Sequence, residues 1–220
     1  MRVGDVEQTD DGLSFRVEVA NRTGHKFPTG HPSRRAWLRV VVRDAAGAVL
    51  ATSGEFDAAG RLVDGAGTPL ASELAGGPIE PHRDAVTSDA EVARFRAVMA
   101  DSTGAATHTL LRGATWLVDD RILPLGWKSD HPDADSTRPV GVAGDANFTG
   151  GADAVRYAFA IDSRGPLTID VELRYQPVST RWVDELSKTE TPEVRRFLRY
   201  WSVADRTPVV VAHDKIVIDG

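Results

Sequence analysis

The chain has 220 residues, of which 41% are hydrophobic and 26% charged, with a net charge of −6 and no cysteine. This length suits one domain, and the acidic balance disfavours nucleic acid as the main partner, because phosphate binding needs a basic face. The lack of cysteine excludes disulfides, thiolate metal ligands and a C-x-x-C-H haem-attachment site within these residues. No apolar run approaches the ~20 residues of a membrane helix, so no membrane insertion is expected, and the N-terminal segment lacks the apolar core of a signal peptide.

Alternating apolar and polar residues predict strands in the first half of the chain. The clearest strand covers 13–20, and 36–44 predicts a second, which the AAG that follows turns back into AVLATSG as a hairpin. EVARFRAVMAD (91–101) fits a helix or a strand, and STG as the turn into the next segment favours a strand. The residues of the first strand expected to point into the core are Leu13, Phe15, Val17 and Val19.

The second half predicts further strands and two helices. Segments 154–162 and 167–176 alternate well, and the SRGP between them predicts that they form a hairpin. STRWVDELSK (179–188) and TPEVRRFLRYWSV (191–203) predict helices, and TPVVVAHDKIVID (207–219) predicts one or two closing strands. The expected fold is mainly β: an antiparallel, immunoglobulin-like sandwich forming a single domain over 1–220, with long loops and a short helical excursion near the C-terminus.

The loop NRTGHKFPTGHPSRR (21–35) is the main candidate site. Each proline restricts the residue before it to extended conformations, and the glycines permit backbone angles closed to other residues, so the loop is stiff and shaped. His25 and His31 are therefore candidate ligands for a haem or a metal. The alternative is that the loop only turns the chain, with each imidazole hydrogen-bonded to the backbone.

Two metal sites are also conceivable. His82, in IEPHRD, would join His25 and His31 in a three-histidine site for zinc, copper or iron if the connection 55–82 folds back onto the loop. GDANFTGGAD (144–153) offers oxygen ligands at calcium-loop spacing. The alternatives are separately satisfied histidines and an Asx-rich turn. The candidate calcium ligands are Asp145, Asn147 and Asp153.

The loop also carries a family resemblance. NRTGHKFPTGHPSRRAW resembles the N-x-T-G-H-K-x-P-T-G-x-P-x-R-R-x-W segment of a β-rich domain found beside haem-binding regions in multihaem c-type cytochromes. The similarity continues, in order, through IEPH (79–82), TLLRGATWLVDDRILPLGW (109–127), GDANFTGGADAVRY (144–157) and ELRYQPVSTRWVDEL (172–186).

The resemblance implies a non-catalytic accessory or interaction domain in an electron-transfer setting, outside the cytoplasm in the periplasm or beyond the cell. It implies a haem-bearing chain or domain as partner, to which His25 or His31 would donate an axial ligand, with no haem attached covalently to this chain. Two other interpretations stay open from the residues themselves. One is an independent protein that binds calcium or a His-ligated transition metal, and the other is a metal-dependent enzyme using the same histidines.

Overall fold

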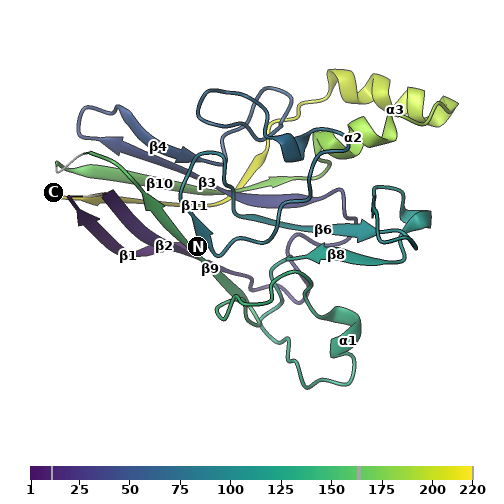
Figure 1. Cartoon of the computed structure of the whole chain (residues 1–220), viewed down its shortest axis with the longest axis horizontal. Coiled ribbons are helices and arrows are strands. Elements are labelled where there is room, and N and C mark those ends of the chain that lie inside the picture. Colours follow the sequence, from purple (N-terminus) through teal and green to yellow (C-terminus); the bar gives the residue numbers. More distant parts are fainter. Residues whose placement is uncertain (11, 163–164, 220) are drawn as a thin grey trace.

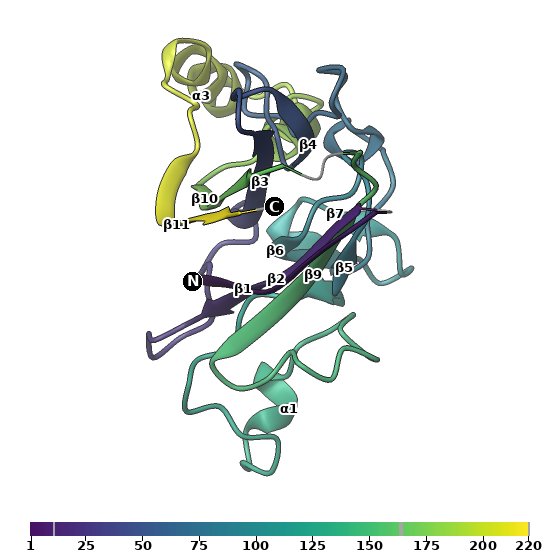
Figure 2. The same ribbon diagram turned by 90° about the vertical axis from the view of Figure 1, so that its left-hand side faces the viewer.

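The computed structural model describes residues 1–10, 12–162 and 165–219, which form a mainly β sandwich of two sheets (Figures 1 and 2). The smaller sheet has four strands, of which the last runs parallel to its neighbour while the other pairs are antiparallel. In spatial order its strands are β1 (Arg2–Thr9), β2 (Gly12–Ala20), β9 (Ala152–Phe159) and β5 (Ala85–Val86).

The larger sheet is antiparallel throughout the described residues. Its main order is β11 (Val209–Ile218), β10 (Leu167–Gln176), β3 (Arg35–Asp44), β6 (Arg94–Ala100) and β7 (Ala106–Thr107). Two further strands are β4 (Val49–Ser53), paired with β3, and β8 (Thr115–Asp119), paired with β6. The hairpin that returns from residues 36–44 is thus confirmed, as is the strand predicted within 91–101.

The core lies between the two sheets and follows the alternation of the sequence. Every second residue of β2 is buried, as predicted, and Phe15 stacks on Tyr157 of β9 with ring centroids 5.2 Å apart. The facing sheet contributes alternate valines, leucines and isoleucines of β3 and β10. The buried residues of β2 are Leu13, Phe15, Val17 and Val19.

The predicted hairpin of 154–162 and 167–176 is wrong. Both segments form strands, but β9 pairs with β2 in the smaller sheet and β10 pairs with β3 and β11 in the larger one. The chain therefore crosses from one sheet to the other between them, through the predicted turn at 163–166, of which 163 and 164 lie outside the described residues. The turn sequence indicated a change of direction, whereas the strand partners were decided by long-range pairing.

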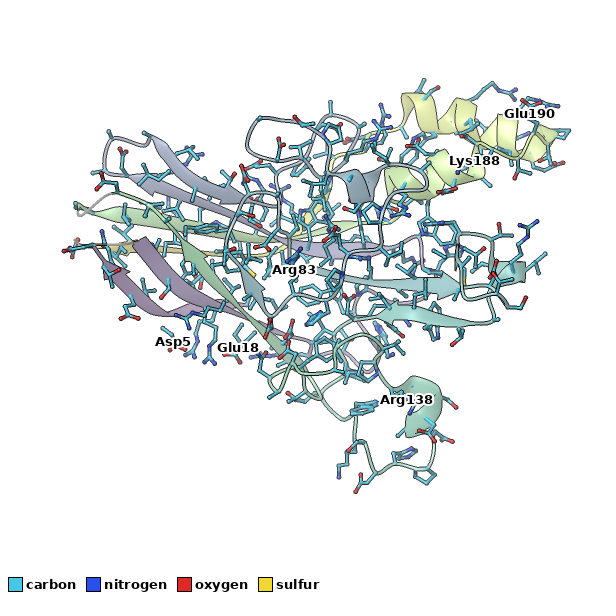
Figure 3. The ribbon with its side chains drawn as sticks, viewed as in Figure 1. Asp5, Glu18, Arg83, Arg138, Lys188 and Glu190 are labelled. Atoms are coloured by element: carbon cyan, nitrogen blue, oxygen red, sulfur yellow. The ribbon has the colours of Figure 1, made fainter. Side chains whose placement is uncertain are left out.

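The helices are few and short, as expected. In α3 (Pro192–Val203), the Thr191 hydroxyl accepts the Val194 N–H at 3.3 Å, so the predicted cap is confirmed. Helices α1 (Ala134–Thr137) and α3 lie on opposite sides of the sandwich (Figures 1 and 2). Charged side chains such as Asp5, Glu18 and Arg138 lie at its periphery (Figure 3). None of the described helices has the length and apolarity needed to cross a bilayer. The others are η1 (Ala71–Glu73), η2 (Leu110–Arg112), α1 (Ala134–Thr137) and α2 (Thr180–Leu186).

A buried ion pair fastens the long connection before β5 to the larger sheet. The Arg35 guanidinium of β3 lies 2.7 Å from the Glu73 carboxylate of η1, and it also donates to the carbonyl of Gly60. Burial disfavours the charged form of Glu73, but Arg35 outweighs burial and holds the pKa of this carboxyl below its usual value. The connection predicted as irregular is therefore anchored by a charge pair.

Replacing Phe15 tests the shared core. Phe15→Ala is expected to lower the free energy of unfolding by about 3–5 kcal/mol, because it removes the stacking partner of Tyr157 and leaves a cavity between the sheets. Arg16→Ala, on the outer face of the same strand, is the matched control and should stay within about 0.5 kcal/mol. Urea denaturation followed by circular dichroism measures both, and equal losses would contradict the assignment of faces.

Replacing Glu73 tests the buried ion pair. Glu73→Gln leaves Arg35 buried without its counter-charge and is expected to cost about 3–5 kcal/mol near neutral pH. Because the pKa of Glu73 is lower in the folded protein, the pair stabilises above the ordinary carboxyl pKa, and that stability is lost as pH falls through the folded value. The difference between wild type and variant should therefore shrink below about pH 4.5. A difference in unfolding midpoint that is independent of pH would refute this account.

Candidate functional site

The loop at 21–34 is held from inside by Asn21. This side chain is buried, and its amide donates to the carbonyls of His25 at 2.8 Å and Ile122 at 3.0 Å. Its oxygen accepts the backbone N–H and the hydroxyl of Thr23. Phe27 then exchanges two backbone hydrogen bonds with Ile122. The N-x-T-G-H spacing therefore fixes the backbone on both sides of His25.

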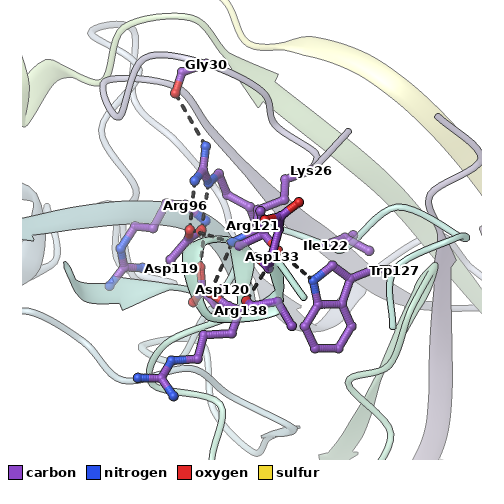
Figure 4. Close-up of polar contacts among 12 residues, drawn as sticks. Lys26, Gly30, Arg96, Asp119, Asp120, Arg121, Ile122, Trp127, Asp133 and Arg138 are labelled. Atoms are coloured by element: carbon purple, nitrogen blue, oxygen red, sulfur yellow. Dashed lines mark hydrogen bonds and ion pairs between the residues drawn. The ribbon is translucent and has the colours of Figure 1, made fainter. Parts of the chain in front are cut away.

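An ion network holds the other side of the loop to the end of β8 (Figure 4). The Asp119 carboxylate lies 2.7 Å from the Lys26 ammonium and accepts two bonds from Arg121, at 2.6 and 2.7 Å. Burial lowers the pKa of Lys26, although the adjacent carboxylate acts in the opposite direction. Arg121 also reaches the carbonyl of Gly30 at 3.4 Å. Loop and strand thus share one buried carboxylate.

His25 is exposed and has the hydrogen bonding of an imidazole ligand. Its Nδ1 lies 3.1 Å from the Lys26 carbonyl, which can only accept, so Nδ1 carries the proton of the neutral ring. The Nε2 lone pair then has no hydrogen-bond partner within the described part of the chain, and the residue is exposed. A ring whose second nitrogen donates to a backbone carbonyl is oriented for metal or haem ligation.

His31 has the opposite arrangement. Its Nδ1 accepts the Ser33 N–H at 3.1 Å, while the Ser33 hydroxyl donates to the carbonyl of Pro177, so the proton of the neutral ring is on Nε2. The ring also packs edge-on against Trp182, with centroids 5.0 Å apart. Burial, followed by the charge of Arg34, lowers the pKa of His31. The geometry favours His25 over His31 as a ligand.

Apolar surface adjoins the loop. A groove of about 270 Å³ is lined by Thr23 and Phe27 of the loop and by Val211 of the edge strand β11. A second groove, of about 470 Å³, is lined by His31, Trp182 and exposed leucines of the η2 region. The loop therefore contributes residues to two apolar grooves, and His31 lines the larger one.

A second cluster of ionisable groups lies buried at the opposite side of β8. His82 Nε2 is 3.0 Å from Asp145 Oδ2 and 3.9 Å from Asp153 Oδ2, while its Nδ1 is 3.5 Å from Asp120 Oδ2. These four side chains are each at most 4% exposed. The Phe148 ring packs edge-on against the imidazole, with centroids 5.2 Å apart. This is a buried cluster of one imidazole and three carboxylates.

The strand register explains why these residues meet. The parallel pairing of β5 with β9 aligns Ala85 with Arg156. His82 lies three residues before Ala85, and Asp153 lies three residues before Arg156. Asp120 is fixed by an exchange of bonds with the Arg96 backbone, whose N–H its carboxylate accepts at 2.6 Å. Asp145 comes from the loop that precedes β9.

Burial and mutual interaction shift the pKa values of His82 and Asp153 within the cluster. Burial alone would lower the pKa of His82, but the carboxylates of Asp120, Asp153 and Asp145 outweigh it and raise that pKa to about 9. Burial and the nearby Asp145 raise the pKa of Asp153 to about 7, against the opposing effect of His82. The cluster contains three carboxylates and one imidazole, so a single imidazolium cannot balance all three carboxylates when they are ionised.

The predicted ligands therefore fall into two places. Within the described residues, His82, Asp145 and Asp153 form the one group of three potential metal ligands whose atoms lie within 4.8 Å of one another, and His25 and His31 lie outside it. The side-chain oxygen of Asn147 accepts the Ala154 N–H at 2.7 Å. The backbone N–H of Asn147 donates to the Asp145 carboxylate, as in an Asx turn. The sequence did not indicate Asp120, although its place one residue after Asp119 predicts that the two face opposite sides.

The fold makes this chain a β-sandwich protein, and part of a multihaem cytochrome chain has a similar fold. The solved structure concerned is a penta-heme cytochrome c552 from Thermochromatium tepidum, matched with a TM-score of 0.52 at 17% sequence identity. The match covers 97% of this chain and 38% of the cytochrome chain. No family model and no curated protein matches the sequence. At this identity the similarity shows the fold alone.

Substitutions at the end of β8 test the network that holds the loop. Asp119→Asn leaves both Lys26 and Arg121 without a counter-charge and is expected to cost about 3–5 kcal/mol of unfolding free energy. Lys26→Met should cost less, about 1–3 kcal/mol, because Asp119 keeps Arg121. Lys188→Met, at an exposed pair with Glu185, is the control and should be nearly neutral. Chemical denaturation gives the ranking, and a larger loss for Lys26→Met than for Asp119→Asn would contradict it.

Proposed function

We propose that this chain is a non-catalytic accessory domain of the multihaem c-type cytochrome type, which binds a haem-bearing partner and donates His25 to it. The proposal places the chain outside the cytoplasm, in an electron-transfer assembly. The fold shared with part of a penta-heme cytochrome chain supports the setting. The absence of cysteine means that any c-type haem would be carried by the partner.

The orientation of His25 is the observation that carries the proposal. Its Nδ1 is engaged by the Lys26 carbonyl, which leaves Nε2 as an exposed lone-pair donor. A neutral imidazole is a common axial ligand of haem iron, and a hydrogen bond at its other nitrogen raises its basicity. The anchoring of the loop by Asn21 and Lys26 means that little order is lost when the ligand engages.

The apolar groove at the start of the loop supports the same partner. Haem presents a broad apolar face, and Phe27 of the loop and Val211 line an apolar groove that offers a matching surface. Val211 is 49% exposed although it is apolar and lies on an edge strand. Exposed apolar residues that gather on a surface are typical of a binding site.

Ligation of His25 can be tested with a c-type haem octapeptide, whose iron carries one peptide histidine and has water at its second axial position. Wild-type protein is expected to convert this haem to the low-spin form, measured by the shift of its Soret band. His25→Ala should weaken the interaction by at least about tenfold, or 1.4 kcal/mol, because the retained loop cannot replace an imidazole. Val211→Asp should weaken it less, through the apolar contact alone.

Two other histidine variants are the matched controls. His31→Ala removes a ring whose Nδ1 is occupied by Ser33, and His131→Ala removes another exposed imidazole outside the loop. Both should titrate like the wild type, with melting temperatures recorded for every variant. If His25→Ala binds the haem peptide as wild type does, or if loss of His131 has the same effect, the assignment of His25 is wrong.

A further inference from the structure

We propose that the buried pocket of His82, Asp145 and Asp153 is a binding site for a divalent transition-metal ion of the Zn²⁺ or Mn²⁺ class. Asp120 would position the imidazole without touching the ion. The site is separate from the His25 loop, so it does not depend on the function proposed above.

The spacing of the ligand atoms fits such an ion. With bonds of about 2.0–2.1 Å and near-tetrahedral angles, ligand atoms around Zn²⁺ stand about 3.3 Å apart. The two distances from His82 Nε2, 3.0 Å to Asp145 Oδ2 and 3.9 Å to Asp153 Oδ2, lie on either side of this value. All three ligand atoms lie within 4.8 Å of one another, so side-chain rotation is enough to bring them to this spacing.

Several polar atoms in the pocket have no hydrogen-bond partner among the described residues. They include Asp153 Oδ2, Asp120 Oδ2 and His82 Nδ1, all buried. The side chains of Asp153 and Asp120 are 0% exposed. A buried carboxylate oxygen without a donor is costly, and a bound cation removes that cost directly.

Asp120 completes the arrangement from the far side of the ring. Its Oδ2 faces His82 Nδ1 at 3.5 Å. Without an ion, the Nε2–H of His82 donates to Asp145 at 3.0 Å. When an ion takes the place of that proton, Asp120 can hold the remaining proton on Nδ1, and the Nε2 lone pair is available to the ion. This is the carboxylate–histidine–metal order that fixes the tautomer of a metal ligand and raises its basicity. The other oxygen of Asp120 is held by the Arg96 N–H, so the carboxylate cannot easily turn away.

The donor set favours a transition metal over calcium. An imidazole suits ions such as Zn²⁺, whereas Ca²⁺ takes six to eight oxygen ligands. The oxygen that a calcium site would recruit, that of Asn147, is already bonded to the Ala154 N–H. One nitrogen and two carboxylate oxygens leave a fourth position for water, a coordination that suits Zn²⁺ or Mn²⁺.

Metal binding can be measured on the purified chain after chelator treatment. Zn²⁺ is expected to bind at one ion per chain in competition with a chromophoric chelator. It should raise the melting temperature by about 5–10 °C at a hundredfold excess over Kd. Co²⁺ should give a visible d–d absorption that Zn²⁺ abolishes, and this readout on wild-type protein does not rely on any variant.

Variants separate ligands from the positioning residue. Asp153→Asn should abolish the Zn²⁺-dependent rise in melting temperature while leaving the metal-free protein at least as stable as wild type, because it relieves buried negative charge. Asp120→Asn should weaken Zn²⁺ binding by about 10–100-fold and alter the Co²⁺ spectrum. Asp133→Asn, whose carboxylate is exposed, is the matched control, and His25→Ala excludes binding at the loop; both should bind Zn²⁺ as wild type does.

Three results would overturn the proposal. One is wild-type protein with no stabilisation by Zn²⁺, Mn²⁺ or Co²⁺ and no Co²⁺ absorption. Another is stabilisation by Ca²⁺ alone, which would assign the pocket to a hard cation. The third is an equal loss of Zn²⁺ binding in Asp153→Asn and Asp133→Asn, which would place the ion at the surface.

Discussion

Two successive carboxylates at the end of β8 connect both candidate sites to one strand. Asp119 faces the loop and pairs with Lys26 and Arg121, whereas Asp120 faces inward towards His82. The alternation of side chains along a strand imposes this division. Movement of the strand end would therefore displace both the loop at 21–34 and the His82 cluster. The pairing of β8 with β6 thus helps to position both.

The two sites differ in how far their buried charges are compensated. Around Asp119, two cations surround one carboxylate, so the charges are largely compensated. Around His82, three carboxylates face one imidazole, and the excess negative charge must be removed by protons or by a cation. The first arrangement makes a rigid support and the second a site that attracts positive charge. Burial gives the two clusters their energetic weight, because water screens neither of them.

The sequence predicted the strands well and their partners less well. Alternation in 13–20 and 167–176 depends on which face is buried, a local property. Both segments are strands, and the first buries the predicted residues. The predicted hairpin between β9 and β10 was wrong, because SRGP indicates a turn of the chain but not which strands pair. The sequence named His82, Asp145 and Asp153 as separate candidates, but their meeting follows from the two-residue parallel pairing of β5 with β9. That pairing leaves no periodic pattern to detect.

The two histidine environments show why residue type alone does not identify a ligand. His25 and His31 share one loop and similar flanking residues, yet their ring nitrogens have opposite roles because a carbonyl faces one Nδ1 and an N–H faces the other. In His25 the lone pair is left to solvent, and in His31 it is used within the loop. For His82, both ring nitrogens face carboxylates, and the Nε2–H donates to Asp145 at 3.0 Å. In His25 and His31, the group at Nδ1 thus decides whether the imidazole lone pair is left to solvent or used within the loop.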